Sequence, residues 1–324
     1  GGPPLLLTVP QLEQLMATAA LFGVHPSHAF TSVETSPEYA DRPRLNVLKK
    51  AGVSRVSIGI QSFQDEELKA IKRRPRQNTI YQALDDIRQM DFPYFNIDLI
   101  YGIKGQTVES FLYSLEEALR FQPNELFIYP LYVRQGTGIT EREPDDVCFR
   151  MYRAACKLLQ AKGFLQTSMR RFIHHPSTDA EVSCGDEVML SCGSGGRSYL
   201  GDLHYATRYT VCQQCIAREI DEYMATTDFT VARNGFILSA KEQQQRFIIK
   251  NLMYYMGIDK AEYTRRFGEP LDRTPLFRQL AEQYWIEETP ERIRLTPEGL
   301  GYSDYIGQLF ITPEIRQLME TYSY

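Results

Sequence analysis

Residues 94–107 read YFNIDLIYGIKGQT, and this stretch contains the structural unit that recurs along the chain. An apolar, β-rich run over Tyr94–Ile100 carries an acidic residue, Asp98, near its end. Thr107 suits the N-cap of a helix, and Glu109 supplies an acid in the first turn. An apolar stripe at helical spacing follows, made by Val108, Phe111, Leu112, Leu115 and Leu119. The stretch therefore predicts a strand, a polar strand end and an amphipathic helix.

Similar strands are predicted at 29–34 (AFTSVE), 55–61 (RVSIGIQ) and 126–133 (LFIYPLYV). An earlier helix has Pro10 near its first turn and Gly23 as its stop. Strands that alternate with amphipathic helices indicate parallel βαβ units, so the predicted fold class is α/β.

Four polar residues fall at or near the ends of these strands: Glu34, Gln61, Asp98 and Tyr132. The intervals between them are 27, 37 and 34 residues, and each interval fits one βαβ step. The carboxyl ends of parallel strands meet at one edge, where α/β proteins bind ligands. Any one of these residues alone suits a loop cap, but the set predicts a common binding edge.

The pattern changes after residue 144. We predict a helix over Asp145–Gln160, a strand over 164–173, and then a loop-rich stretch to about residue 235. From Ser239 the chain is mostly helical, and RIRLTPEGL (292–300) predicts a short strand before a Thr296-capped helix. The predicted domains are 1–234 and 235–324.

Composition excludes several classes of protein. The 324 residues are 43% hydrophobic and carry a net charge of −5, so nucleic-acid and membrane partners are not expected. No apolar run of about 18 residues is present, and no secretory signal is visible. Six cysteines are too few for a disulfide framework. These features predict a reduced, cytoplasmic protein.

Taken together, RVSIGIQSF (55–63), NIDLIYGIKGQT (96–107) and GGPP (1–4) resemble the HemN-like branch of radical S-adenosylmethionine (SAM) enzymes, the oxygen-independent coproporphyrinogen III oxidase-like proteins. ETSP (34–37) and GSGGRSY (193–199) extend the resemblance, and the chain looks closest to an uncharacterised bacterial subgroup. The resemblance implies a partial parallel (β/α) barrel. A small, mostly helical C-terminal domain would cover its mouth.

The resemblance also implies two cofactors, SAM and a 4Fe–4S cluster. In the family, a C-x3-C-x2-C loop after the first strand holds the cluster, and a Gly-Gly-Thr-Pro turn follows the second strand. Here GGPP stands at residue 1, so we expect the first two strands and the cluster cysteines upstream of Gly1. This chain alone would then hold no cluster ligand and be inactive; a linker origin of the two glycines is the alternative.

Binding roles follow from the resemblance position by position. Gly1 and Gly2 would let the backbone approach the SAM amino group, whereas Pro3 replaces the usual threonine. Glu34 would accept hydrogen bonds from the ribose diol. Gln61 and Asp98 would contact a second SAM or the substrate side, although a strand-end aspartate also suits a loop cap.

Arg73 matches a family position that also contacts a second SAM or the substrate side of the pocket. Its neighbours Lys72 and Arg74 make a solvated surface position an equally good interpretation. Tyr132 and Arg197 match positions that line SAM through their backbone. The glycines of the turn before Arg197 would allow close approach; they are Gly193, Gly195 and Gly196.

The remaining cysteines and histidines offer weaker signals. CQQC (212–215) has the spacing of half a metal site, which Cys184 and Cys192 would have to complete. Cys148 and Cys156 suit the buried side of a helix. His204 follows the glycine-rich turn closely enough to reach the binding edge.

Three functions remain open. The first is hydrogen abstraction from an unidentified, small or tetrapyrrole-like substrate by radical SAM chemistry, with flavodoxin or ferredoxin as electron donor. Arginines near the mouth would bind substrate carboxylates; the candidates are Arg134, Arg170, Arg171 and Arg197. The second is a haem-binding chaperone or another non-catalytic relative. The chaperones carry H-N-x-x-Y-W, but 179–192 reads DAEVSCGDEVMLSC. The third is a natural-product methyltransferase or cyclopropane-forming enzyme.

Overall fold

The computed structural model describes residues 4–22, 29–74, 76–134, 136–174, 188–208, 210, 213–271 and 275–321. Within them, six strands form the main sheet in the order β1-β2-β3-β4-β6-β5. Their bounds are β1 Ser32–Thr35, β2 Arg55–Gln61, β3 Tyr94–Tyr101, β4 Glu125–Pro130, β5 Leu165–Gln166 and β6 Arg171–Ile173. Strands β1 to β4 are parallel, as the βαβ pattern predicts. The sheet is open across the described residues, because β1 and β5 remain its edges.

The single strand predicted over 164–173 is wrong, because this segment forms two short antiparallel strands, β5 and β6. A turn at Ser168 separates them, and the Ser168 hydroxyl accepts hydrogen bonds from the amides of Arg170 (3.3 Å) and Arg171 (3.2 Å). Strand β6 then pairs antiparallel with β4 and extends the parallel sheet by a strand of opposite direction.

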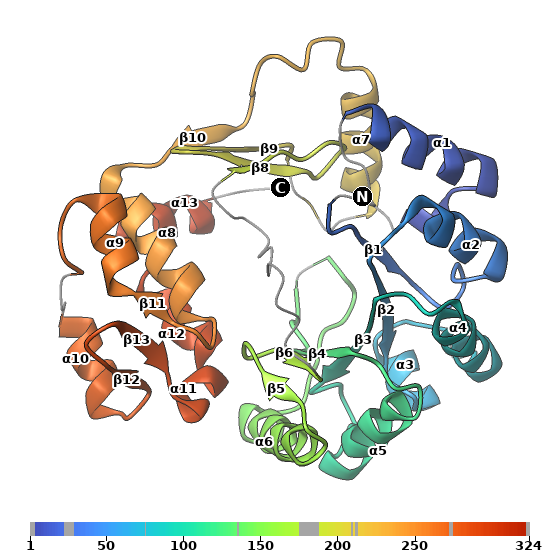
Figure 1. The fold of residues 1–324 in the computed structure, drawn as a ribbon, viewed down its shortest axis with the longest axis horizontal. Coiled ribbons are helices and arrows are strands. Elements are labelled where there is room, and N and C mark those ends of the chain that lie inside the picture. Colours follow the sequence, from blue (N-terminus) through green and yellow to red (C-terminus); the bar gives the residue numbers. More distant parts are fainter. Residues whose placement is uncertain are drawn as a thin grey trace.

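Helices cover one face of the main sheet (Figure 1). They and the short elements near them are η1 Pro4–Leu6, α1 Val9–Leu21, α2 Arg42–Ala51, α3 Asp65–Ala70, α4 Gln77–Met90, α5 Val108–Leu119 and α6 Asp145–Ala161. The predicted cap of α5 is confirmed, since the Thr107 side chain accepts from the Ser110 amide at 3.1 Å. Helix α6 ends one residue beyond its predicted end.

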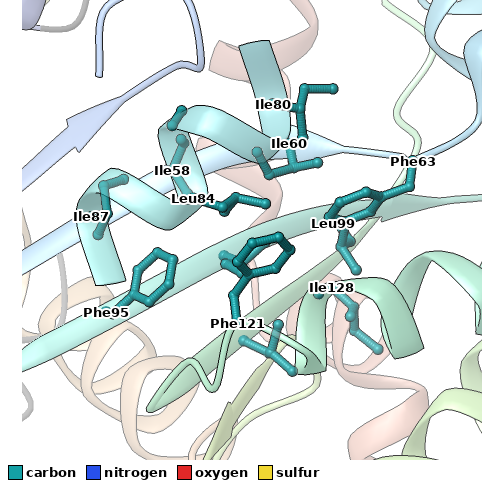
Figure 2. Packing of buried hydrophobic residues seen from close by; sticks show 14 of the residues in the cluster. Ile58, Ile60, Phe63, Ile80, Leu84, Ile87, Phe95, Leu99, Phe121 and Ile128 are labelled. Carbon is teal, nitrogen blue, oxygen red and sulfur yellow. The ribbon is translucent and has the colours of Figure 1, made fainter. Parts of the chain in front are cut away.

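The core of this part lies between the sheet and its helices. Figure 2 shows Leu84 and Ile87 of α4 pointing toward Ile58 of β2 and Phe95 of β3. All four side chains are at most 5% exposed. The burial of these and the other apolar side chains between sheet and helices is the main contribution to the stability of the βαβ units. The opposite face of the sheet is therefore free to carry polar residues.

A second sheet occupies the stretch that was expected to be loop-rich, so that expectation is wrong for these residues. Its order is β10-β9-β8-β7, with β7 Val188–Met189, β8 Arg197–Leu200, β9 Leu203–Ala206 and β10 Gly235–Ile237. Helix α7, Gln213–Met224, lies between β9 and β10 in the chain. Because β10 pairs with β9, the domain boundary near residue 235 stays a prediction.

The C-terminal part has its own hydrophobic cluster, which includes Ile248, Phe277 and Ile293. Its elements are α8 Ala240–Leu252, β11 Ile258–Asp259, α9 Lys260–Phe267, α10 Pro275–Glu282, β12 Ile286–Glu288, β13 Arg292–Leu295, α11 Pro297–Gly301, α12 Ser303–Leu309 and α13 Pro313–Thr321. The predicted Thr296 cap of α11 is confirmed, with the Gly299 amide 3.0 Å from its hydroxyl. This part and the small sheet lie across from the sheet face that lacks helices (Figure 1).

None of the helices in the described ranges combines the length and the apolar character needed to cross a membrane.

Candidate functional site

A row of polar side chains crosses the helix-free face of the main sheet. Glu34 of β1 is in register with Ser57 of β2, Ser57 with Asn96 of β3, and Asn96 with Glu125 of β4. Residues in register share a face of the sheet, and side chains alternate between faces along each strand. The apolar neighbours of these residues therefore face the helices. We call Glu34, Ser57, Asn96 and Glu125 the polar row.

Asp98 lies one step nearer the carboxyl ends of the strands than the polar row. Its carboxylate accepts hydrogen bonds from Asn96 Nδ2 at 2.7 Å and from the Ser57 hydroxyl at 3.3 Å. Burial raises the pKa of Asp98 to about 6, and the negative charge of Glu34 adds to this rise. The hydrogen bond from Asn96 and the positive charge of Arg55 oppose it. Asp98 is therefore a carboxyl group that titrates close to neutral pH.

Glu125 anchors the opposite end of the polar row. Its side chain is 3% exposed and lies between two arginines, with Arg55 Nε at 2.7 Å and Arg171 Nε in contact with the other oxygen. Arg55 also lies over the ring of Phe127, 5.5 Å from its centroid. Because Arg55, Glu125 and Arg171 belong to β2, β4 and β6, these ion pairs hold three strands together.

Gln61 ends β2 with a φ of 73°, a backbone conformation that non-glycine residues seldom adopt. Its amide folds back over Gly59, where a Cβ would lie 2.5 Å from Gln61 Nε2. Gly59 is in register with Asp98, so the Gln61 amide lies on the strand pair that carries Asp98. The predicted residues Gln61, Asp98 and Glu34 thus come together at one edge.

Tyr132, two residues beyond β4, instead reaches the C-terminal part. Its hydroxyl lies 2.5 Å from Arg170 Nη2, and both groups contact the carboxylate of Asp304 on α12. Burial, and then the hydrogen bond with Asp304, raise the pKa of Tyr132 to about 12. We call Tyr132, Arg170 and Asp304 the interdomain triad. Arg170 and Arg171 were predicted to bind substrate carboxylates. They form ion pairs within the protein instead, with Asp304 and Glu125.

Arg73 is exposed in the segment after α3, and its amide donates to the Leu68 carbonyl at 2.8 Å. Its exposure fits the reading of a solvated surface. Arg197 begins β8 in the small sheet and is also exposed. Gly193 and Gly195 have φ of 101° and 82°, which agrees with the tight turn predicted before Arg197.

Gly1, Gly2 and Pro3 lie outside the described residues, as do Cys184 and Cys212. Cys148 is buried and Cys156 is half-buried on α6, as predicted. Within the described ranges, no three metal-binding side chains converge on one point. A 4Fe–4S cluster therefore does not fit the residues that the structure describes.

Sequence reasoning missed Ser57, Asn96, Glu125 and Arg55. A signal was present for three of them, because Arg55, Ser57 and Asn96 stand in predicted strands at the alternate spacing of one sheet face, whereas Glu125 lies just before the strand predicted at 126–133. Parallel sheets are commonly buried on both faces, so polar residues within the strands are a weaker signal than those at the strand ends.

Comparisons with known proteins agree with this architecture. The Radical SAM superfamily model matches residues 1–118, and the HemN C-terminal domain model matches residues 238–301. "Heme chaperone HemW" of Bacillus subtilis (strain 168) is 26% identical over 328 residues, covering 95% of this chain and 84% of the relative. "Oxygen-independent coproporphyrinogen III oxidase" of Escherichia coli (strain K12) is 24% identical over 330 residues, covering 92% and 70%.

Among solved structures, coproporphyrinogen III oxidase (HemN) from Escherichia coli superposes with a TM-score of 0.78 at 22% identity. The match covers 96% of this chain and 76% of that one, and it establishes the α/β fold with its C-terminal helical domain. The chain therefore carries a radical SAM domain followed by a HemN C-terminal domain.

Proposed function

We propose that this chain binds SAM at the carboxyl edge of β1 to β3 and serves radical SAM chemistry of the oxidoreductase type. The observation that carries the proposal is the convergence of Glu34 and Asp98, from two different strands, on the helix-free face of the sheet. Such an edge is the usual ligand site of parallel α/β sheets. The match of residues 1–118 to the Radical SAM superfamily model supports the identity of the ligand.

Each residue has a role that its chemistry supports. The exposed Glu34 carboxylate would accept hydrogen bonds from the ribose hydroxyls. Asp98, with a pKa of about 6, is mostly ionised at pH 7.5 and would accept from an ammonium or a hydroxyl group. Gln61, held over Gly59, would supply an amide to the same ligand. Gly1, Gly2, Arg73, Tyr132 and Arg197 stay predicted contacts.

The 4Fe–4S cluster, when bound, would supply the electron that cleaves a carbon–sulfur bond of SAM. The described residues offer no ligand set for it, so Glu34, Gln61 and Asp98 are assigned to SAM alone. A small electron-transfer protein such as flavodoxin or ferredoxin would deliver the electron.

The relatives support the substrate class less directly than the ligand, because some are named haem chaperones and others coproporphyrinogen III oxidases. DAEVSCGDEVMLSC (179–192) contains neither histidine nor tyrosine, which disfavours a chaperone that needs H-N-x-x-Y-W. We therefore favour an enzyme that acts on a small or tetrapyrrole-like molecule. Arg134 and Arg197 stay predicted contacts for its carboxylates.

The test is SAM binding and cleavage by the protein expressed from its full reading frame and reconstituted anaerobically with iron and sulfide. Under reductant we expect 5′-deoxyadenosine to form. Glu34→Gln should weaken SAM binding about 10- to 100-fold, the effect of losing hydrogen bonds to a charged group. Glu116→Gln, on the exposed side of α5, removes the same charge at a distance and should change nothing. Equal SAM binding by both variants would overturn the assignment of Glu34.

A further inference from the structure

Two buried residues of the polar row, Asn96 and Ser57, have no assigned part in the proposed SAM site. Asn96 on β3 is fully buried, and Ser57 on β2 is 4% exposed. Polar side chains are costly to bury unless they are hydrogen-bonded, so their partners show what such residues do. Neither side chain offers appreciable surface to a ligand. Any role in binding must therefore act through a neighbour.

That neighbour is Asp98. Asn96 Nδ2 donates one N–H to Asp98 Oδ1 at 2.7 Å and the other to the Ser57 hydroxyl at 2.6 Å. The Ser57 oxygen is thus an acceptor for Asn96, and its own O–H donates to Asp98 Oδ2 at 3.3 Å. Each oxygen of the Asp98 carboxylate therefore receives one donor, and the two donors come from different strands. This arrangement fixes the plane of the carboxylate. We call Asn96 and Ser57 the donor pair.

The donor pair opposes two effects that favour the protonated form of Asp98. Burial disfavours its charge, and the negative charge of Glu34 disfavours it further. Among the groups that favour the ionised form, Asn96 contributes most, followed by Arg55 and then Ser57. The charged or titratable side chains that face Asp98 or its neighbours from the surrounding elements are Glu34 of β1, Arg55 of β2, Tyr129 of β4 and, beyond Tyr129, Arg170 of the turn between β5 and β6. Burial, and then the charges of Asp98 and Glu34, raise the pKa of Tyr129, so its hydroxyl stays uncharged.

We propose that Asn96 and Ser57 are positioning residues, which hold Asp98 ionised and oriented to accept a hydrogen bond from the ligand. The proposal rests on the proposed function, in which Asp98 binds SAM. Hydrogen bonds from N–H and O–H groups favour a carboxylate over the acid. An ionised Asp98 can only accept, so it selects an ammonium or a hydroxyl group of the ligand, whereas a protonated Asp98 could also donate. The donor pair thereby determines which polar groups this part of the site admits.

The first measurement is the titration of the Asp98 carboxyl group without ligand, in the protein expressed from its full reading frame. NMR follows the ¹³C-labelled side-chain carboxyl carbons of aspartate, and Asp98→Asn identifies the Asp98 signal by its loss. In the wild type we expect a pKa of about 6. Asn96→Leu keeps a branched side chain without donors and should raise this pKa by about 1–2 units, the value of a hydrogen bond to a charged group. Ser57→Ala should raise it less, because the bond from Ser57 is longer.

The second measurement is the affinity for SAM at two pH values, by equilibrium dialysis. At pH 6.5 Asn96→Leu should bind SAM roughly tenfold more weakly than the wild type, because much less of its Asp98 is ionised. At pH 8.5 Asp98 is mostly ionised in both proteins, so the two affinities should converge. The ratio of the two affinities cancels the titration of SAM itself. If Asn96 had only a structural role, its loss would weaken binding equally at both pH values, and that result would contradict the proposal.

Two further variants serve as controls. Ser114→Ala removes another buried serine hydroxyl, on α5, which accepts from the Phe63 amide at 3.1 Å, and it should leave the pKa of Asp98 unchanged. Ser57→Thr keeps the hydroxyl and should titrate like the wild type. An Asp98 pKa that is the same in the wild type and Ser57→Ala, and in Asn96→Leu where that variant folds, would overturn the proposal.

The two measurements also separate this proposal from the proposed function, because the titration of Asp98 needs no ligand. If the pKa of Asp98 rises in both donor-pair variants while none of the proteins binds SAM, the donor pair holds Asp98 ionised and the assignment of SAM is wrong. If SAM binds and the pKa stays constant, the assignment of SAM stands and the role of the donor pair is wrong.

Discussion

The Arg55–Glu125–Arg171 cluster gives the sharpest test of how the main sheet is held together. Glu125 is 3% exposed, and Glu125→Gln keeps its shape while removing its charge. Removing one partner of a buried ion pair typically costs about 3–5 kcal/mol. The two arginines are 20% and 22% exposed, so water would partly solvate the charges left behind. We therefore expect the free energy of unfolding to fall by about 2–3 kcal/mol.

The assay is urea unfolding followed by far-UV circular dichroism. At an m-value of about 3 kcal/mol/M, this loss lowers the midpoint by nearly 1 M while the slope is retained. The matched control is Glu66→Gln, which removes the same charge from an exposed pair with Lys69 and should leave the midpoint unchanged. If Glu125→Gln unfolds at the wild-type midpoint, or if Glu66→Gln shifts the midpoint equally, the ion pairs do not hold these strands together.

Three further results are expected. The folded-state pKa of Asp98, about 6, exceeds its ordinary value of 3.8, so protonated Asp98 contributes stability that is fully present below pH 4 and lost as the pH rises through 6. Asp98→Asn should therefore be about 3 kcal/mol more stable than the wild type at pH 8 and similar to it at pH 4 in urea unfolding; equal differences at both pH values would contradict this. Gly59→Ala should displace the Gln61 amide and weaken SAM binding several-fold in equilibrium dialysis, with little loss of stability because only the end of a flexible side chain must move. Unchanged SAM affinity would remove Gln61 from the site. Asp304→Asn removes the carboxylate of the interdomain triad, and faster hydrogen exchange in α12 is expected by mass spectrometry, with α4 as the internal reference; unchanged exchange in α12 would mean that the triad does not tie the two parts together.

The sequence alone was sufficient for the parts of the fold that local patterns determine. Strand β2 was predicted with its observed bounds, and the caps at Thr107 and Thr296 follow from residues within one helical turn. The hairpin at 165–173 was missed because its break depends on hydrogen bonds to the Ser168 hydroxyl, which hydrophobic periodicity does not record.

Long-range pairing was the other limit on the prediction of the site. Arg170 pairs with a residue 134 positions away and Arg171 with one 46 positions away, so their positions near the mouth did not disclose their partners. The positive φ of Gln61 was likewise invisible. The clustering of Glu34, Gln61 and Asp98 was within reach, because topology alone brings parallel strand ends together.

The alternation of side chains over residues 55–59 of β2 and 95–98 of β3 separates two tasks along each strand. Val56, Ile58 and Ile97 face the helices and determine whether the domain folds, whereas Ser57, Asn96 and Asp98 face the other way and determine what the sheet can hold. Substitutions at the second set leave the helix-side packing intact. The ligand preference of such a sheet can therefore change through single substitutions at every second residue, while the packing against the helices stays the same.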